Sequence, residues 1–352
     1  MQARIREMLE RERENILSVY RDLHAIPELS AQEYRTSAYI ADYLEKRGFQ
    51  VQRGVGGTGL VSYLRGEDPG PVLGIRADMD ALGHLVDGEI QAIHSCGLFQ
   101  PSEEQEETSG ARAMIADGVL EDMDMCIGIH LRPIQEARYG QAVSALKHGA
   151  LATVTAEITG ATAHGGRPHL GKNVVDALAA IVNAVNAIWV DPTVPASAKV
   201  TALNAGGANY SSIPEKGEMG ADLRANTNEV MEELLEKVEH AIRTGASTIG
   251  CSADVRRVPG LPAAVFDRDM IRIADEAIRE TLGDEGALGE RGTTGAEDFH
   301  EYVKAKPELR TTYIGLGCDL EPGLHHPEMS FRQDALLDGV AILANMAGRI
   351  LG

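Results

Sequence analysis

The order of hydrophobic and polar positions along the chain predicts an α/β fold. Apolar residues recur at helical spacing over residues 4–23 and 334–351, which gives each helix one apolar face. Short, continuous apolar runs lie at residues 72–75, 125–129 and 312–316. Runs of this length without alternation are typical of strands buried on both faces, so we expect a sheet with helices on both sides.

A second helix is expected after Pro27, with Ser30 as its N-cap. Glu33 follows three residues later, and this spacing predicts a capping box, in which Ser30 and Glu33 bond the first free N–H groups of the helix.

The middle of the chain follows a different pattern. Its expected elements are strands and helices in the order β-α-β-β-α-β, at about 153–158, 173–190, 199–203, 215–224, 228–244 and 251–258. This order is typical of ferredoxin-like α+β domains. We therefore predict a discontinuous larger domain, residues 1–148 and 259–352, with a smaller domain inserted at 149–258.

Composition excludes several classes of partner. The chain has 352 residues with 33 basic and 53 acidic side chains, a net charge of −20. Such a charge repels nucleic-acid phosphates and anionic membrane surfaces. No apolar run reaches the roughly 18 residues of a membrane span, and the first residues are charged, so we expect a cytoplasmic protein. The four cysteines form no C-x-x-C pair, which argues against a zinc knuckle.

Candidate chemistry begins at Asp78 and Asp80, directly after the buried run at 72–75. Open α/β sheets bind ligands just outside the carboxyl ends of their strands, where carboxylates can orient a metal or its histidine ligand. A lone Asp-x-Asp fits a solvated turn equally well.

Further polar residues follow other apolar runs or expected turns. The pair Glu103 and Glu104 could divide labour between proton transfer and metal binding, although an acidic helix start is a common alternative. His130 ends the run at 125–129, His325 follows a glycine-containing turn, and Cys96 offers a thiolate. Nitrogen, oxygen and sulfur donors of this kind suit zinc or a similar divalent ion.

His164 lies in a glycine-rich loop, residues 163–169, where it could contact a substrate or simply cap the next helix. Serine-hydrolase, P-loop and dinucleotide-binding motifs do not occur in a suitable context.

Seven motifs in order give the chain a resemblance to one metallopeptidase family, whose members include aminoacylase, hippurate-hydrolase and auxin-conjugate-hydrolase amidohydrolases. The chain looks closest to the AmhX-like branch. The motifs are RADMDAL at 76–82, HSCG at 94–97, FQPSEE at 99–104, GIH at 128–130, AHGGRPH at 163–169, GAEDF at 295–299 and LHHP at 324–327.

The resemblance implies a fold and a set of roles. The fold would be a catalytic domain with a mixed sheet between helices, plus an inserted ferredoxin-like lid and dimerisation domain. Glu103 would be the general acid/base and Asp80 the orienting carboxylate, while His164 and Arg224 would contact the substrate. The implied metal ligands, for up to two divalent ions in relatives (Zn, Mn, Co or Ni), are Cys96, Glu104, His130 and His325.

Three departures from the family pattern stand out. Relatives continue the Cys-Gly motif with a metal-binding histidine, a helix and most of a strand, whereas here Leu98 follows Gly97 directly. On the order of 30 residues are missing, the size of a βαβ crossover. We expect a spatial break between Gly97 and Leu98, and at most one bound metal. Ser211 replaces a family asparagine, and Gly83 replaces a common proline.

The leading hypothesis is a metal-dependent amidohydrolase that acts on N-acyl amino acids or related small amides, as a homodimer formed through the inserted domain. One alternative is a metal-poor pseudoenzyme that keeps the fold as a binding protein. The other is an aminopeptidase or dipeptidase of the same architecture.

Overall fold

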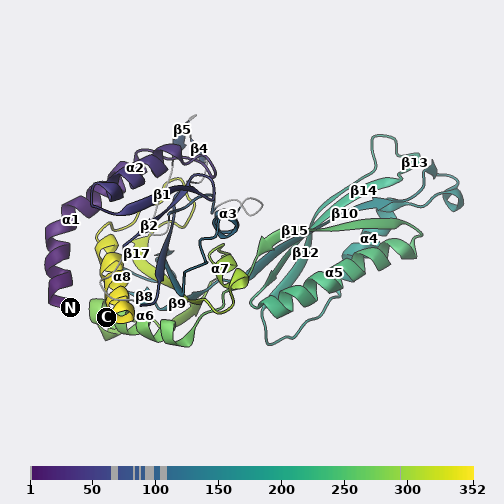
Figure 1. Cartoon of the computed structure of the whole chain (residues 1–352). Helices are drawn as coiled ribbons and strands as arrows, with labels where there is room; N and C mark the ends of the chain where they lie inside the picture. The colour runs from purple at the N-terminus through teal and green to yellow at the C-terminus, as the bar shows by residue number, and fades with distance from the viewer. Residues whose placement is uncertain are drawn as a thin grey trace. The chain divides into compact units, whose positions relative to one another are not determined.

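The computed structural model of the chain divides into two compact units (Figure 1). The first unit comprises Met1–Lys147, Val265–Thr293 and Glu297–Gly352, and the second comprises His148–Ala264 and Thr294–Ala296. The structure describes residues 2–64, 70–81, 84–86, 89–91, 99–103, 109–293 and 295–352. The sequence predicts 149–258 for the smaller domain, and the second unit extends six residues further because its last strand continues to Leu261.

The first unit is built on a seven-stranded mixed sheet in the order β1-β2-β6-β3-β7-β17-β8. The four strands β6, β3, β7 and β17 run parallel to one another, and β1, β2 and β8 are attached by antiparallel pairing. The strands are β1 Gln50–Val55, β2 Gly59–Tyr63, β3 Leu73–Asp78, β6 Phe99–Gln100, β7 Met125–Pro133, β8 Ala142–Val143 and β17 Arg310–Leu320. The three predicted apolar runs therefore lie in adjacent central strands.

Helices cover both faces of this sheet. Alternate residues of β7, such as Ile127, pack against α6 and α8, while Cys126 faces the opposite side with α3 and α7. In Figure 1, α1, α6 and α8 lie around one side of the sheet. The helices are α1 Gln2–His24, α2 Tyr34–Glu45, α3 Gly110–Ala116, α6 Arg268–Leu282, α7 His300–Ala305 and α8 Ala335–Leu351. Minor elements are β4 His84–Val86, β5 Glu89–Gln91, β9 Ala145–Lys147, β16 Glu290–Gly292 and the 3-10 turn Asp284–Gly286.

The predicted capping box at Ser30 and Glu33 is wrong. Helix α2 begins at Tyr34, and the carboxylate of Glu28 accepts the N–H groups of Arg35 and Thr36, each at 2.8 Å. A carboxylate at this end of a helix satisfies free donors and complements the helix dipole. The Ser30 and Glu33 side chains therefore make tertiary contacts instead.

The second unit has the chain order β-α-β-β-α-β that the hydrophobic pattern predicts. Its four strands pair antiparallel in the order β12-β14-β10-β15, and α4 and α5 pack on one face of the sheet (Figure 1). The elements are β10 Ala150–Thr159, α4 Val174–Asn186, β12 Ala196–Ala205, β14 Lys216–Ala225, α5 Asn228–Thr248 and β15 Ser252–Leu261, with the short β11 Ala163–His164, β13 Ser212–Ile213 and 3-10 turn Pro168–Leu170 beside them.

The residues before Glu103 form β6, which has only two residues. Phe99 pairs with Leu60 of β2 on one side and with Ala77 of β3 on the other. Even this short segment fills the gap between two longer strands, so Glu103 follows the sheet directly. Among the described residues, no helix combines the length and apolarity that crossing a bilayer requires.

Candidate active site

The candidate site lies where the parallel strands of the first unit end. Strand β3 ends at Asp78, β6 at Gln100, and His130 lies near the end of β7. Because parallel strands present their carboxyl ends at one edge of a sheet, polar residues that follow them gather there.

A buried arginine organises this edge. Arg76 in β3 is 1% exposed, and its guanidinium donates to Asp78 at 2.8 Å, to Asp298 at 2.8 Å and to Gln100 at 3.0 Å. It also forms an ion pair with Glu297 at 3.0 Å. Burial disfavours the charged guanidinium, but the surrounding carboxylates raise the pKa of Arg76 well above its usual value. The arginine therefore stays charged and binds three acidic side chains.

Asp298 connects the sheet to helix α3. Its carboxylate accepts hydrogen bonds from Gln100 at 2.6 Å and from the hydroxyl of Ser109, the N-cap of α3, at 2.7 Å. Burial raises the pKa of Asp298 to about 6, against the opposing effect of Arg76. Its contacts with Arg76, Gln100 and Ser109 tie three segments together.

Three carboxylates meet at the end of β6. Oxygen atoms of Glu103, Glu297 and Asp298 lie within 4.8 Å of one another. Glu297 is buried and accepts a hydrogen bond from the Tyr313 hydroxyl at 2.6 Å. Burial tends to raise the pKa of Glu297, but the charges of Arg76 and the neighbouring groups lower it overall. Glu297 and Asp298 are therefore fixed in the buried network, and the half-buried Glu103 completes the group.

His130 has the chemistry of a metal ligand. Its Nδ1 lies 2.7 Å from the carbonyl oxygen of Leu131, which can only accept, so Nδ1 carries the proton and Nε2 has the free lone pair. Burial lowers the pKa of His130, and Arg132 lowers it further. A neutral imidazole with Nε2 unprotonated is the form that coordinates a divalent ion.

Of the other three predicted metal ligands, the structure describes only His325. Cys96 and Glu104 lie outside the described residues, as does the junction of Gly97 and Leu98, so the expected break there stays a prediction. His325 is exposed, with a left-handed backbone (φ 63°), in the turn after β17. It is not part of the group formed by Glu103 among the described residues.

The remaining predicted site residues belong to different units, Asp80 to the first and His164 and Arg224 to the second. Asp80 is buried and accepts a hydrogen bond from Ser30 at 2.6 Å. In the second unit, His164 is exposed and its Nδ1 accepts the N–H of Gly166 at 2.9 Å. Arg224 pairs with Asp222 at 3.1 Å, on the same strand.

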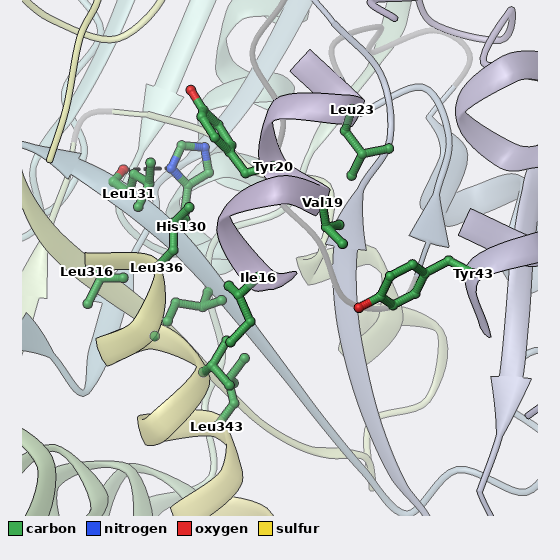
Figure 2. A pocket seen from close by; sticks show the side chains of 13 residues that line it. Ile16, Val19, Tyr20, Leu23, Tyr43, His130, Leu131, Leu316, Leu336 and Leu343 are labelled. Atoms are coloured by element: carbon green, nitrogen blue, oxygen red, sulfur yellow. Dashed lines mark hydrogen bonds between the residues drawn. The ribbon is translucent and has the colours of Figure 1, made fainter. Parts of the chain in front are cut away.

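An apolar cavity of about 210 Å³ borders the site through His130. Figure 2 shows side chains of α1 and α8 around it, with the imidazole of His130 at one edge. The lining residues are Ile16, Val19, Tyr20, Leu23, Tyr43, Ile129, His130, Leu131, Leu316, Leu336, Gly339, Val340 and Leu343. Apolar cavities of about 150 Å³ already accept a benzene-sized group, so this one can hold an apolar substituent.

Sequence reasoning assigned no role to Arg76, Glu297 or Asp298. All three belong to motifs that were recognised, RADMDAL and GAEDF. The signal that could have identified them is the arginine itself, because a charged residue in the middle of an apolar strand needs acidic partners.

Carboxylates and a neutral imidazole that follow the parallel strands of a mixed α/β sheet have the donor chemistry of a divalent-metal site. The comparison with known families agrees. The profile of Peptidase family M20/M25/M40 matches residues 95–349, and the chain belongs to this family.

Two of the similar proteins are hydrolases by name. The chain is 29% identical to the probable hydrolase sll0100 of Synechocystis over 379 aligned positions, covering 94% of both proteins. It is 28% identical to the IAA-amino acid hydrolase ILR1-like 2 of Arabidopsis thaliana, covering 96% of this chain and 85% of that one. The alignment with sll0100 is longer than the 352 residues of this chain, so that relative carries residues that are absent here.

Solved structures show the same fold. A protein of methicillin-resistant Staphylococcus aureus described as an aminohydrolase superposes with a TM-score of 0.90 at 22% identity, covering 100% of both chains. The Bacillus subtilis YXEP protein, a dinuclear metal-binding peptidase of family M20, superposes with a TM-score of 0.78 at 22% identity, covering 96% of this chain and 98% of that one.

Proposed function

We propose that the protein hydrolyses the amide bond of N-acyl amino acids or related small amides, with Glu103 as general acid/base. The observation that carries this proposal is the position of Glu103. It joins two fully buried carboxylates at the strand ends, where Arg76 holds both of them. Glu103 is the half-buried member of the group, so it is the carboxylate that a substrate can reach.

A divalent ion fits the donor chemistry, since His130 presents an unprotonated Nε2. Cys96, Glu104, His130 and His325 would hold the ion, which would supply Lewis-acid polarisation of the amide carbonyl and a more acidic water. Glu103 would take a proton from the attacking water and deliver it to the leaving nitrogen. Asp80, fixed by Ser30, would orient a ligand side chain.

Two observations favour an N-acyl substrate over a free peptide. The cavity beside His130 has an almost wholly aliphatic and aromatic lining, which suits an apolar acyl group. A free α-amine needs an acidic partner, and Glu297 and Asp298 already form ion pairs with Arg76. Both points favour an aminoacylase-type activity over an aminopeptidase.

We further propose that the domain at 149–258 is a ferredoxin-like lid and dimerisation domain. Its strand β12 is an edge strand of ten largely exposed residues, and such an edge can pair with a second copy. His164 would then help to hold the developing oxyanion, and Arg224 would contact the substrate carboxylate. A cytoplasmic location stays a prediction from the sequence.

The activity is tested by offering the purified protein, with Zn²⁺, Mn²⁺, Co²⁺ or Ni²⁺, a series of N-acetyl and N-benzoyl amino acids beside the matching free dipeptides. We expect turnover of the N-acylated compounds. Turnover of free dipeptides alone would establish the aminopeptidase alternative, and tight ligand binding without any turnover would establish the pseudoenzyme.

The assembly is tested by sedimentation at micromolar concentration. We expect a dimer that becomes monomeric when Val200 in β12 is replaced by Pro, because proline removes a backbone donor and breaks the strand. A wild-type protein that is wholly monomeric and fully active would contradict this assembly.

A further inference from the structure

The segment at residues 28–33 lies across the ends of β3 and β6. Leu29 forms an isolated parallel bridge with Ala81, and the N–H of Ala81 donates to the carbonyl of Glu28 at 2.9 Å. The segment therefore borders both Asp80 and Glu103 at the point where their strands leave the sheet.

Glu33 holds the turn that carries Glu103. Its side chain is fully buried, and Oε1 accepts the N–H of Ser102 at 2.9 Å and the N–H of Ala31 at 2.8 Å. Its other oxygen accepts the hydroxyl hydrogen of Thr58. Ser102 has a left-handed backbone (φ 54°), which non-glycine residues rarely adopt without a fixed partner. Because Ser102 directly precedes Glu103, this hydrogen bond helps to set the direction in which Glu103 leaves the sheet.

Ser30 makes the second contact from the same segment. Its hydroxyl donates to Oδ2 of the buried Asp80 at 2.6 Å. The short path between Ser30 and Glu33 includes Ala31, which also has a left-handed backbone (φ 61°). One irregular loop thus contacts the side chain of Asp80 and the backbone directly before Glu103, at two neighbouring strand ends.

We propose that Glu33 and Ser30 are positioning residues, which fix the backbone turn before Glu103 and the carboxylate of Asp80. This inference rests on the proposed function for the roles of those two side chains. The contacts themselves, between residues 69 and 50 positions apart in the sequence, stand independently of it.

Glu28 provides a matched control in the same segment. It is also a carboxylate that accepts backbone N–H groups, but its partners are Arg35 and Thr36 at the start of α2. Replacing Glu28 removes a helix cap, whereas replacing Glu33 removes a support of the Glu103 turn. A purely structural role would make the two variants equivalent.

The test compares Glu33→Ala, Glu33→Gln, Ser30→Ala and Glu28→Ala in the metal-loaded full chain. For Glu33→Ala we expect kcat per folded molecule to fall by about tenfold to a hundredfold, since small misplacements of a catalytic group cost that much, with KM changed by less than about twofold. Glu33→Gln should restore most of the rate, because its amide oxygen can accept both N–H groups while its NH₂ donates to Thr58. Glu28→Ala should keep the wild-type kcat.

Hydrogen exchange gives a second readout that needs no substrate. The backbone amide of Ser102 should exchange faster in Glu33→Ala than in Glu28→Ala or the wild type. Equal exchange in all three, or equal loss of kcat in Glu28→Ala and Glu33→Ala at matched stability, would overturn the proposal. If Glu33→Ala does not fold, Ser30→Ala decides, and a wild-type kcat in that variant would overturn the proposal. If the wild type hydrolyses no N-acyl amino acid, the proposed function fails, and the exchange rates still decide the positioning.

Discussion

The two units bury very different side chains. The described part of the first unit buries a large set of polar and charged residues, including Arg76, Glu297 and Asp298. Among the described residues of the second unit, His148 is the polar side chain with this degree of burial, and the core there consists of aliphatic residues and one thiol. The first unit therefore carries the cost of buried charge at its strand ends, while the second is a simple apolar layer between a sheet and two helices.

The difference follows from strand direction. Four parallel strands bring their carboxyl ends to one edge, so residues distant in sequence can converge on a single guanidinium. The antiparallel sheet of the second unit sends neighbouring strand ends to opposite edges. Its polar residues, such as Glu157 and Arg256, lie on the exposed face.

The largest expected effect is on catalysis. Glu103→Gln should keep the fold but lower kcat by several orders of magnitude, about 10²- to 10⁴-fold for loss of one acid/base group. The matched variant in the second unit, Glu157→Gln, changes an exposed carboxylate and should keep the wild-type kcat. Steady-state kinetics of both metal-loaded variants measures this. Near-normal turnover by Glu103→Gln would remove the proposed role.

The next effect is on stability. Arg76→Met leaves the buried Glu297 and Asp298 and the half-buried Asp78 without their cationic partner and should destabilise the first unit by about 3–5 kcal/mol. Arg257→Met in the second unit breaks ion pairs of a side chain that is 40% exposed, and exposed pairs contribute about 0.2–1 kcal/mol. Urea unfolding of the two variants gives both values. Similar losses would show that burial does not distinguish the two networks.

Replacing either of two helix glycines with alanine should change the free energy of unfolding by a smaller amount, and in opposite directions. A Cβ on Gly245 in α5 would lie 3.0 Å from Cα and 3.1 Å from N of Ile181 in α4, so the helices must separate. We expect Gly245→Ala to cost about 1–3 kcal/mol. A Cβ on Gly339 in α8 would meet the flexible end of Leu316 at 3.0 Å, beside the apolar cavity into which that side chain can move. Gly339→Ala should therefore gain up to about 1 kcal/mol of helix propensity. Thermal unfolding measures both effects. A lower melting temperature for Gly339→Ala would show that the Leu316 side chain cannot move into the cavity.

The smallest effect concerns thiol reactivity. Burial raises the pKa of Cys126 to about 12 and that of Cys318 to about 11. At pH 8 the thiolate of Cys126 would be about one part in ten thousand, and the thiolate is the reactive form. In a Cys96→Ser background, a disulfide reagent should label neither thiol before the first unit unfolds, whereas Cys251 in the second unit should react sooner. Labelling in guanidinium gives the total number of reactive thiols. Rapid modification of Cys126 in the folded protein would contradict its burial.

The sequence by itself determined the elements and the kinds of chemical group. The runs at 125–129 and 312–316 could be assigned to buried strands because a strand covered on both faces needs apolar residues at every position. Helix α1 was expected at 4–23 and spans Gln2–His24, since its apolar spacing is regular. The motif residues are visible in the sequence, and within the sequence the N-acyl specificity rests on the family resemblance.

Only the tertiary structure decided which groups meet. Arg76 and Asp298 are 222 positions apart, and nothing local requires them to be partners. Glu33 shows that local spacing can also predict a contact that does not form. Its spacing from Ser30 predicts a capping box, whereas its carboxylate accepts the N–H of Ser102. Local spacing reports the hydrogen bonds that a segment could make by itself. The bonds that form are those that satisfy every buried donor once the strands are assembled, and that depends on the whole sheet.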